Sequence, residues 1–145
     1  MKCRSDIRFF LRIEPDISKL THQNGVKPFV LPNGKASIHK TRELENLEAF
    51  YISHLKSQAP ETPWECPIRL TTAWYFLKPK GKKGKFKLTK PDTDNLIKTL
   101  KDCMKRAGYF VDDALVVVET TMKFWVDESE PHGIDIYMSD CSTEE

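Results

Sequence analysis

The sequence predicts one small α/β domain of the α+β type over residues 1–145, with a mixed sheet of about four strands and two main helices. A chain of 145 residues that is 39% hydrophobic has the usual size for a single domain with one core. Several segments alternate apolar and polar residues as half-buried strands do, and two others repeat apolar residues at helical spacing.

The N-terminal segment is expected to form a strand, because every second residue from 7 to 13 is apolar: Ile7, Phe9, Leu11 and Ile13. Phe10 alone breaks the alternation. Residues 16–38 are rich in Gly, Pro, Asn and Lys and show no sustained periodicity. They predict a loop longer than usual, of the kind that is mobile or functional.

The first main helix is expected between Thr41 and Lys56. Apolar residues recur there at helical spacing: Leu44, Leu47, Tyr51 and Leu55. Pro60 and Pro63 end this helix. The segment from Ile68 to Leu77 is rich in β-branched and aromatic residues, which favours a second strand.

Residues 78–90 contain seven lysines and two glycines in thirteen positions, which indicates a flexible basic loop. The second main helix is expected from about Asp94 to Ala107, with Gly108 just after its last turn. Its apolar stripe consists of Leu96, Ile97, Leu100, Cys103, Met104 and Ala107.

The C-terminal part is expected to add two strands. Within residues 114–126, Val116, Val118, Met122 and Phe124 alternate with Glu119, Thr121 and Lys123. After a turn at 127–133, residues 134–138 alternate again and predict a closing strand antiparallel to the previous one. Residues 140–145 are expected to form a frayed tail.

Composition narrows the class of protein. The net charge is only +2, but lysines crowd between Lys78 and Lys105, so the local field there is positive. Four scattered cysteines, with no zinc-site spacing, predict free thiols in a reducing cytoplasm. No run approaches the roughly 20 apolar residues of a membrane helix, and the charged start does not resemble a signal peptide. We therefore expect a cytoplasmic protein without a membrane partner.

Two carboxylates, Asp92 and Asp94, stand where the basic loop meets the second helix. In an extended segment both would point to the same side and could share a cation. Alternatively, Asp94 caps the helix by accepting a backbone N–H, which is the commoner role for a single aspartate in this place. Lys98 follows Asp94 by one helical turn, where it could contact phosphate or form an ordinary surface ion pair.

A second acidic pair, Asp112 and Asp113, begins the strand that follows this helix. Because neighbouring elements usually pack together, a tight return could bring the pair to the helix N-terminus. Lys101, Lys105 and Arg106 add positive charge near these aspartates. A nuclease needs carboxylates to hold magnesium and adjoining lysines to neutralise phosphates, although a lysine run is more often a solvated loop.

A D-x-D-N-x-x-K box runs from Asp92 to Lys98, and Asp112-Asp113 follow it. Around the acidic pair stand Ala107-Gly108-Tyr109 and Ala114-Leu115-Val116. Together these residues closely resemble the RusA family of Holliday junction resolvases, over about the C-terminal third to half of the chain. The first half resembles the family only in its order of elements.

The resemblance implies a small α/β domain, a homodimer and metal-dependent hydrolysis of phosphodiesters at branched DNA. Asp92, Asp94 and Asp113 match the family's essential carboxylates, and Lys98 matches its essential lysine. The resemblance also suggests a bacterial, phage or prophage recombination setting.

Other positions match less directly. Asn95 and Asp102 match family positions that support the site, and Asp112 is the neighbour of the favoured ligand. Some relatives carry an arginine immediately before the first aspartate. This chain has Pro91 there, which leaves a phosphate contact to Lys90 or to nothing.

From these matches we expect Asp92, Asp94 and Asp113 to hold one or two Mg²⁺ ions, for which Mn²⁺ can substitute, so that metal-activated water attacks the phosphodiester. Lys98 would stabilise charge on the phosphoryl oxygens. A C2 dimer would present two sites to opposing strands of a nearly two-fold junction. Further DNA contacts are expected from Lys80, Lys82, Lys83, Lys85, Lys87, Lys90, Lys101 and Lys105.

Two other classes of protein remain open. A non-catalytic DNA-binding module would use the same lysines, while the aspartates only cap and pair. A structural or interaction protein would show no salt-sensitive affinity for DNA. Trp64, Trp74 and Trp125 are expected to be core or edge aromatics rather than base-stacking platforms, and Phe86 in the basic loop is a weaker exception.

Overall fold

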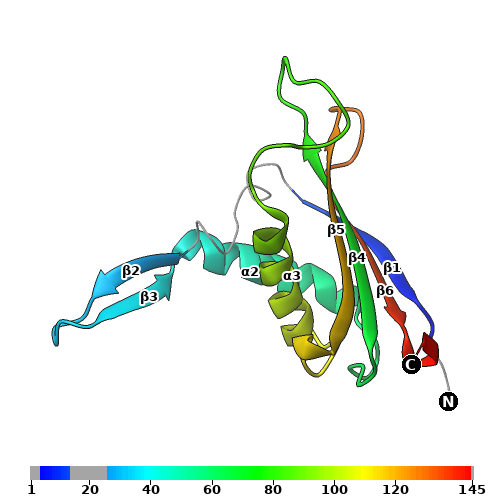
Figure 1. Cartoon of the computed structure of the whole chain (residues 1–145), viewed down its shortest axis with the longest axis horizontal. Coiled ribbons are helices and arrows are strands. Elements are labelled where there is room, and N and C mark those ends of the chain that lie inside the picture. Colours follow the sequence, from blue (N-terminus) through cyan, green and yellow to red (C-terminus); the bar gives the residue numbers. More distant parts are fainter. Residues whose placement is uncertain (1–3, 14–25, 145) are drawn as a thin grey trace.

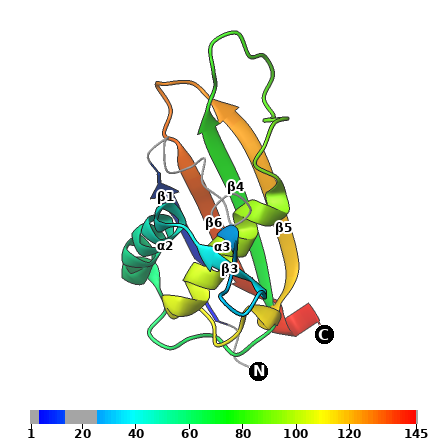
Figure 2. The same ribbon diagram turned by 90° about the vertical axis from the view of Figure 1, so that its left-hand side faces the viewer.

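The computed structural model describes residues 4–13 and 26–144, and for 26–30 and 36–40 it describes the backbone alone. Its body is a four-stranded mixed sheet in the order β1-β6-β4-β5, with both long helices on one face (Figures 1 and 2). The strands are β1 (Ile7–Arg12), β4 (Ile68–Leu77), β5 (Val116–Val126) and β6 (Gly133–Asp140). The helices are α2 (Arg42–Leu55) and α3 (Thr93–Arg106). The predicted α+β architecture is confirmed.

The core lies between the sheet and the two helices. On the central strand β4, Ile68, Leu70 and Trp74 are fully buried. The apolar stripes of the helices pack against them: Leu44, Leu47, Tyr51 and Leu55 from α2, and Leu96, Ile97, Leu100, Cys103 and Met104 from α3. Both stripes expected from the sequence are therefore core, which explains why the two helices cover the same face.

Helix α3 is the crossover between two parallel strands. β4 and β5 pair in parallel along their whole lengths, so the chain must leave the carboxyl end of β4 and return to the amino end of β5. α3 makes that return and runs antiparallel to both strands. Its N-terminus therefore points toward the carboxyl end of β4, and its C-terminus lies near the amino end of β5 (Figure 1).

The C-terminal end of α3 is fixed by buried contacts. Gly108 takes a φ of 97° just past the helix, as expected of the residue that ends it. The hydroxyl of the next residue, Tyr109, is buried and donates to the carbonyl of Leu55 at 2.6 Å. The backbone N–H of Trp64 donates to the carbonyl of Tyr109 at 3.0 Å. These bonds tie the end of α3 to α2 and to the segment before β4.

The order of the last two strands differs from a simple hairpin. β6 pairs antiparallel with β4 and with β1, and β4 is parallel to β5. β6 therefore runs antiparallel to β5, as expected, but β4 lies between them. The turn at 127–132 must pass over the end of β4.

Part of the segment expected to be one long loop is a hairpin. β2 (Val26–Val30) and β3 (Ala36–Lys40) pair antiparallel and project away from the body (Figure 1). Pro28 interrupts the alternation within β2, whereas Asn33-Gly34 lies in the turn between the two strands. Residues 16–25 of the expected loop lie outside the described residues.

The C-terminal residues 140–144 are held against the sheet, so the expected frayed tail is wrong for them. Ser142–Glu144 form a short 3-10 helix, η3. The Asp140 carboxylate accepts the backbone N–H of Ser142 at 2.9 Å. Arg69 on β4 forms an ion pair with Glu144, with Nη2 and Oε1 2.8 Å apart.

Two further findings concern the cysteines and the helices. Cys66, Cys103 and Cys141 are free thiols. Within the part of the chain that the structure describes, no helix has the length and apolar character needed to span a membrane.

Candidate active site

The aspartate pair of the D-x-D box lies at the start of α3. Asp92 is the N-cap residue, with an extended backbone (φ −74°, ψ 152°), and its side chain makes no capping hydrogen bond. Asp94 lies inside the first helical turn and is exposed. The prediction that both aspartates lie in an extended segment is therefore wrong, because the helix begins at Thr93. The alternative prediction, that Asp94 caps the helix, is also wrong, because Asp92 is the N-cap residue. The positive end of the helix dipole stabilises both carboxylates.

Lys123 fixes the backbone that leads into this pair. Its ammonium group donates to the carbonyls of Thr89 and Pro91, at 2.8 and 2.9 Å. Lys123 pairs with Trp74 in the sheet, so its side chain lies on the face that the helices cover. Two charge-assisted hydrogen bonds from a rigid strand hold the residue before Asp92 in place.

Basic side chains surround the start of α3 in different ways. Lys90 lies beside the first carboxylate, with Nζ 3.7 Å from Asp92 Oδ2. Lys98 is exposed one turn along the helix. Lys101 is engaged by β5, since its Nζ is 2.8 Å from Glu119 Oε1. The predicted DNA contact of Lys101 would have to replace that ion pair.

Asp113 lies at the other end of α3. It is the first residue of the 3-10 helix η2 (Asp113–Leu115), which precedes β5. Because α3 has 14 residues, its two ends are about 21 Å apart at 1.5 Å per residue. In Figure 1, η2 lies at the end of α3 that is opposite to the basic loop. One chain alone therefore does not bring Asp113 to Asp92 and Asp94.

Asp112 has a structural task. Its carboxylate accepts the backbone N–H of Ala114 at 3.1 Å and so caps η2. That hydrogen bond, with smaller contributions from Asp113 and from the charge of Lys105, lowers the pKa of the Asp112 carboxyl. Lys105 Nζ lies 4.0 Å from it.

A different acidic group joins the two helices. Glu48 on α2 and Asp102 and Cys103 on α3 bring ligand atoms within 4.8 Å of one another. The guanidinium of Arg106 already donates to Glu48 at 3.2 Å and to Asp102 at 3.3 Å. Glu48 is buried, and a buried carboxylate requires such a partner. This group is best explained as an ion network that holds α2 to α3.

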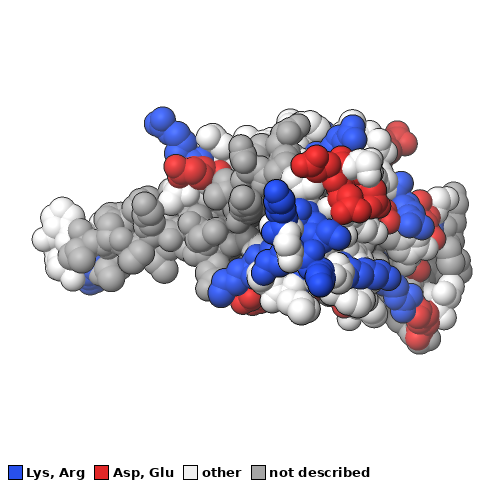
Figure 3. All heavy atoms as spheres, turned by 90° about the horizontal axis from the view of Figure 1, so that it is seen from above, with Lys and Arg blue, Asp and Glu red and all other residues white. Residues whose placement is uncertain are grey.

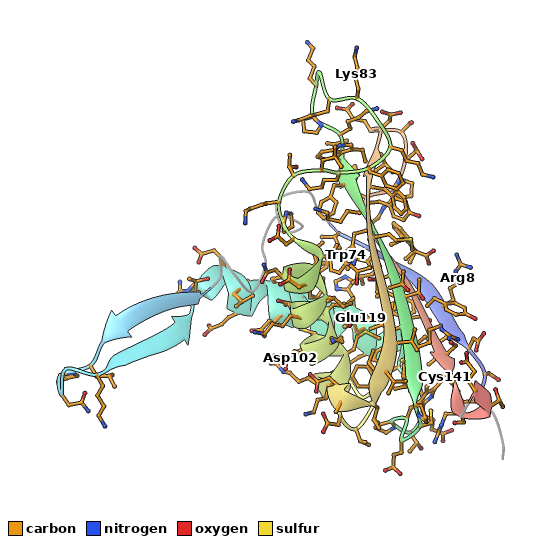
Figure 4. The ribbon with its side chains drawn as sticks, in the orientation of Figure 1. Arg8, Trp74, Lys83, Asp102, Glu119 and Cys141 are labelled. Carbon is orange, nitrogen blue, oxygen red and sulfur yellow. The ribbon has the colours of Figure 1, made fainter. Side chains whose placement is uncertain are left out.

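The basic loop, residues 78–90, extends beyond the carboxyl end of β4, and Lys83 points outward at its tip (Figure 4). Among the described residues, Lys80, Lys82 and Lys83 form no ion pair. Lys87 lies over the Trp125 ring, with Nζ 4.4 Å from the centroid. Figure 3, which looks down on this end, shows the basic side chains gathered beside a separate acidic area.

Comparison with known proteins identifies the family. A family model described as endodeoxyribonuclease RusA matches residues 18–137. The chain belongs to this family. A crossover junction endodeoxyribonuclease RusA of Lactococcus phage r1t is 31% identical over 119 residues, which cover 77% of this chain and 84% of that protein. The RusA-family chain is thus a nuclease that hydrolyses DNA, as the sequence predicted, and the non-catalytic alternative is set aside.

Sequence reasoning missed Lys123 and Glu119, the β5 residues that hold the start and the middle of α3. Its only signal was the polar set on alternate positions of β5. The polar residues Glu119, Thr121 and Lys123 lie on the face of the sheet that the helices cover, because they pair with buried positions of β4. The apolar residues that alternate with them lie on the opposite face. Backbone carbonyl acceptors such as those of Thr89 and Pro91 leave no trace in a sequence.

Replacing Lys123 by Met should lower the rate of DNA cleavage by about 10-fold or more, which corresponds to roughly 1.4 kcal/mol. The apolar side chain would release the carbonyls of Thr89 and Pro91, and the aspartate pair would lose its fixed position. Cleavage rate and thermal unfolding are measured together. Lys56→Met, on the surface after α2, is the matched control. Unchanged cleavage by Lys123→Met would show that the two hydrogen bonds do not position the site.

Proposed function

We propose that this RusA-family chain is a homodimeric, Mg²⁺-dependent enzyme that nicks four-way DNA junctions. The observation that carries the proposal is a pair of exposed carboxylates, Asp92 and Asp94, held directly beside a lysine-rich loop. Metal-assisted cleavage of DNA needs carboxylates that hold the metal and, close to them, lysines that neutralise the phosphates. The name of the phage r1t relative, a crossover junction endodeoxyribonuclease, supports a branched substrate.

The donor atoms at the start of α3 suit magnesium. Asp92 makes no capping bond, and its ion pair is the 3.7 Å contact with Lys90, so carboxylate oxygen atoms are available at the surface. Oxygen donors are those that Mg²⁺ prefers, whereas soft metals prefer thiolates and imidazoles. A bound Mg²⁺ would polarise the scissile phosphodiester and supply an activated water.

Asp113 would complete the site from a second subunit. Since Asp113 and Asp94 lie at opposite ends of α3, two copies with antiparallel α3 helices would bring each Asp113 to the aspartate pair of the other copy. A two-fold axis makes this exchange reciprocal, so one dimer would contain two equal sites. Each site would then combine Asp92 and Asp94 of one protomer with Asp113 of the partner subunit.

The edge of the sheet near Asp113 supports such a dimer. β5 is an edge strand, and its first half carries the exposed side chains Val117 and Val118, 62% and 38% accessible. An edge with unpaired backbone groups and exposed valines is a ready surface for another chain. Burying it in a dimer would place the interface next to η2.

The lysines of the chain have separable tasks in this proposal. Lys98, which is exposed one turn after Asp94, would donate to the phosphoryl oxygens as charge grows on them. Lys90, beside Asp92, takes the phosphate contact that an arginine makes in some relatives. Lys80, Lys82 and Lys83 bind phosphates farther along the DNA arms and read the shape of the junction more than its sequence.

Asp94→Asn should abolish Mg²⁺-dependent cleavage of a synthetic four-way junction and leave junction binding within about twofold, because only a metal-binding carboxylate is lost. Cleavage and binding are measured on the same labelled junction, with and without Mg²⁺. Asp127→Asn, in the turn after β5, is the matched control and should cleave normally. Persistent cleavage by Asp94→Asn would place the site elsewhere.

Replacing Lys80, Lys82 and Lys83 together by Ala should make the slope of log affinity against log salt less negative by up to about 2.7, at about 0.9 for each phosphate that is no longer neutralised. Lys101→Ala should change the slope far less, because Glu119 already engages that lysine. The slopes come from binding titrations at several salt concentrations. Equal slopes for the triple variant and the native chain would show that these lysines of the basic loop do not contact DNA phosphates.

A further inference from the structure

The face of the sheet turned away from the helices is uncovered by any described element (Figures 1 and 2). Its upper part is aromatic. Phe10 on β1, Tyr75 on β4 and Phe124 on β5 lie on this face, and Phe86 of the basic loop joins them. Phe86 and Phe10 are 56% and 40% exposed, and a contiguous exposed apolar patch often marks a binding site.

The four rings form a continuous row. Tyr75 and Phe124 stack with centroids 5.4 Å apart and planes 20° apart. Phe86 follows at 5.5 Å from Phe124, and Phe10 lies 6.2 Å from Tyr75 at the other end. Phe10 and Tyr75 therefore meet across β6, where Gly133 is the strand residue beside Tyr75.

Positive charge lies at the Phe86 end of this row. Phe86 stands between Lys85 and Lys87 in the basic loop. The ammonium group of Lys85 is 5.5 Å from the ring centroids of both Phe86 and Phe124. An exposed ring beside lysines fits a ligand with flat apolar faces and negative charge. Nucleic acid with unpaired bases has that chemistry.

Phe86 is also fixed relative to the proposed active site. The backbone N–H of Lys87 donates to the carbonyl of Lys123 at 3.3 Å, and a β5 N–H donates to the carbonyl of Lys85 at 2.8 Å. The loop is thus paired with β5 on both sides of Phe86. The side chain of the same Lys123 donates to the segment before Asp92. Lys123 therefore holds both the loop that carries Phe86 and the backbone that leads to Asp92.

We propose that Phe86, backed by the Phe124 ring, stacks on bases that are left unpaired at a DNA branch point. The inference rests on the proposed function for its substrate and adds a contact with bases to the phosphate contacts of the lysines. In a duplex the faces of the bases are covered by their neighbours, so the contact favours branched and single-stranded DNA. Every base has such a face, so it carries little sequence preference.

The test compares Phe86→Ala with Leu88→Ala, a residue of the same loop that is 90% exposed. Affinities are measured without divalent metal for an oligothymidylate, a four-way junction and a duplex of equal length. Phe86→Ala should weaken binding of the first two by roughly 5- to 150-fold, the loss expected for one base–aromatic stack, and of the duplex by less than about twofold. Leu88→Ala should bind all three DNAs normally. Phe86→Tyr, which keeps an aromatic ring, should bind the oligothymidylate and the junction with nearly native affinity.

A 2-aminopurine at the branch point supplies a second measurement, because stacking on a protein ring quenches its fluorescence. The quenching should appear with the native chain and disappear with Phe86→Ala. Equal losses for duplex and single strand, or no loss at all, would overturn the proposal. A change in oligomeric state of Phe86→Ala on sedimentation would instead assign the aromatic row to an interface between copies. Since no cleavage is needed, a failure of the proposed junction nicking would be seen separately.

Discussion

The arrangement of the site follows from one constraint, the crossover of α3 between two parallel strands. A helix that returns the chain from β4 to β5 must run antiparallel to both. The residues before it and after it therefore lie at opposite ends, about 21 Å apart for 14 residues. Asp92 and Asp94 stand at one end and Asp113 at the other, so a cation shared by all three would require a second subunit. The same constraint would make dimerisation a condition of catalysis.

β5 is the element that positions the start of the site. Lys123 holds the backbone before Asp92, and Glu119 engages Lys101 on the middle of α3. The opposite side of β5 carries Phe124, against which Phe86 packs. One edge strand thus joins the carboxylates on the covered face to the aromatic row on the open face. DNA that contacts both would pass around this edge of the sheet.

The sequence predicted the elements better than their relations. β4 begins and ends where its β-branched and aromatic run does, and α3 ends next to Gly108, because local composition determines both. The hairpin of β2 and β3 was hidden because Pro28 breaks the alternation of β2 and because both strands are only five residues long. The separation of Asp113 from Asp94 depends on the direction of a crossover that pairs distant strands. No local pattern encodes that direction. The sequence alone therefore offers no evidence on whether Asp113 and Asp94 lie close together within one chain.

The most direct test of the proposed shared site mixes the variants Asp94→Asn and Asp113→Asn, each of which should be inactive alone, and allows their subunits to exchange. In a mixed dimer one site would lose both carboxylates, and the other would keep Asp94 of one protomer and Asp113 of the partner subunit. Junction nicking should then return to about a quarter of the native level, since half of the dimers are mixed and each has one intact site of two. If the mixture stays as inactive as its components although mixed dimers form, each site is built within one chain, and the account is wrong.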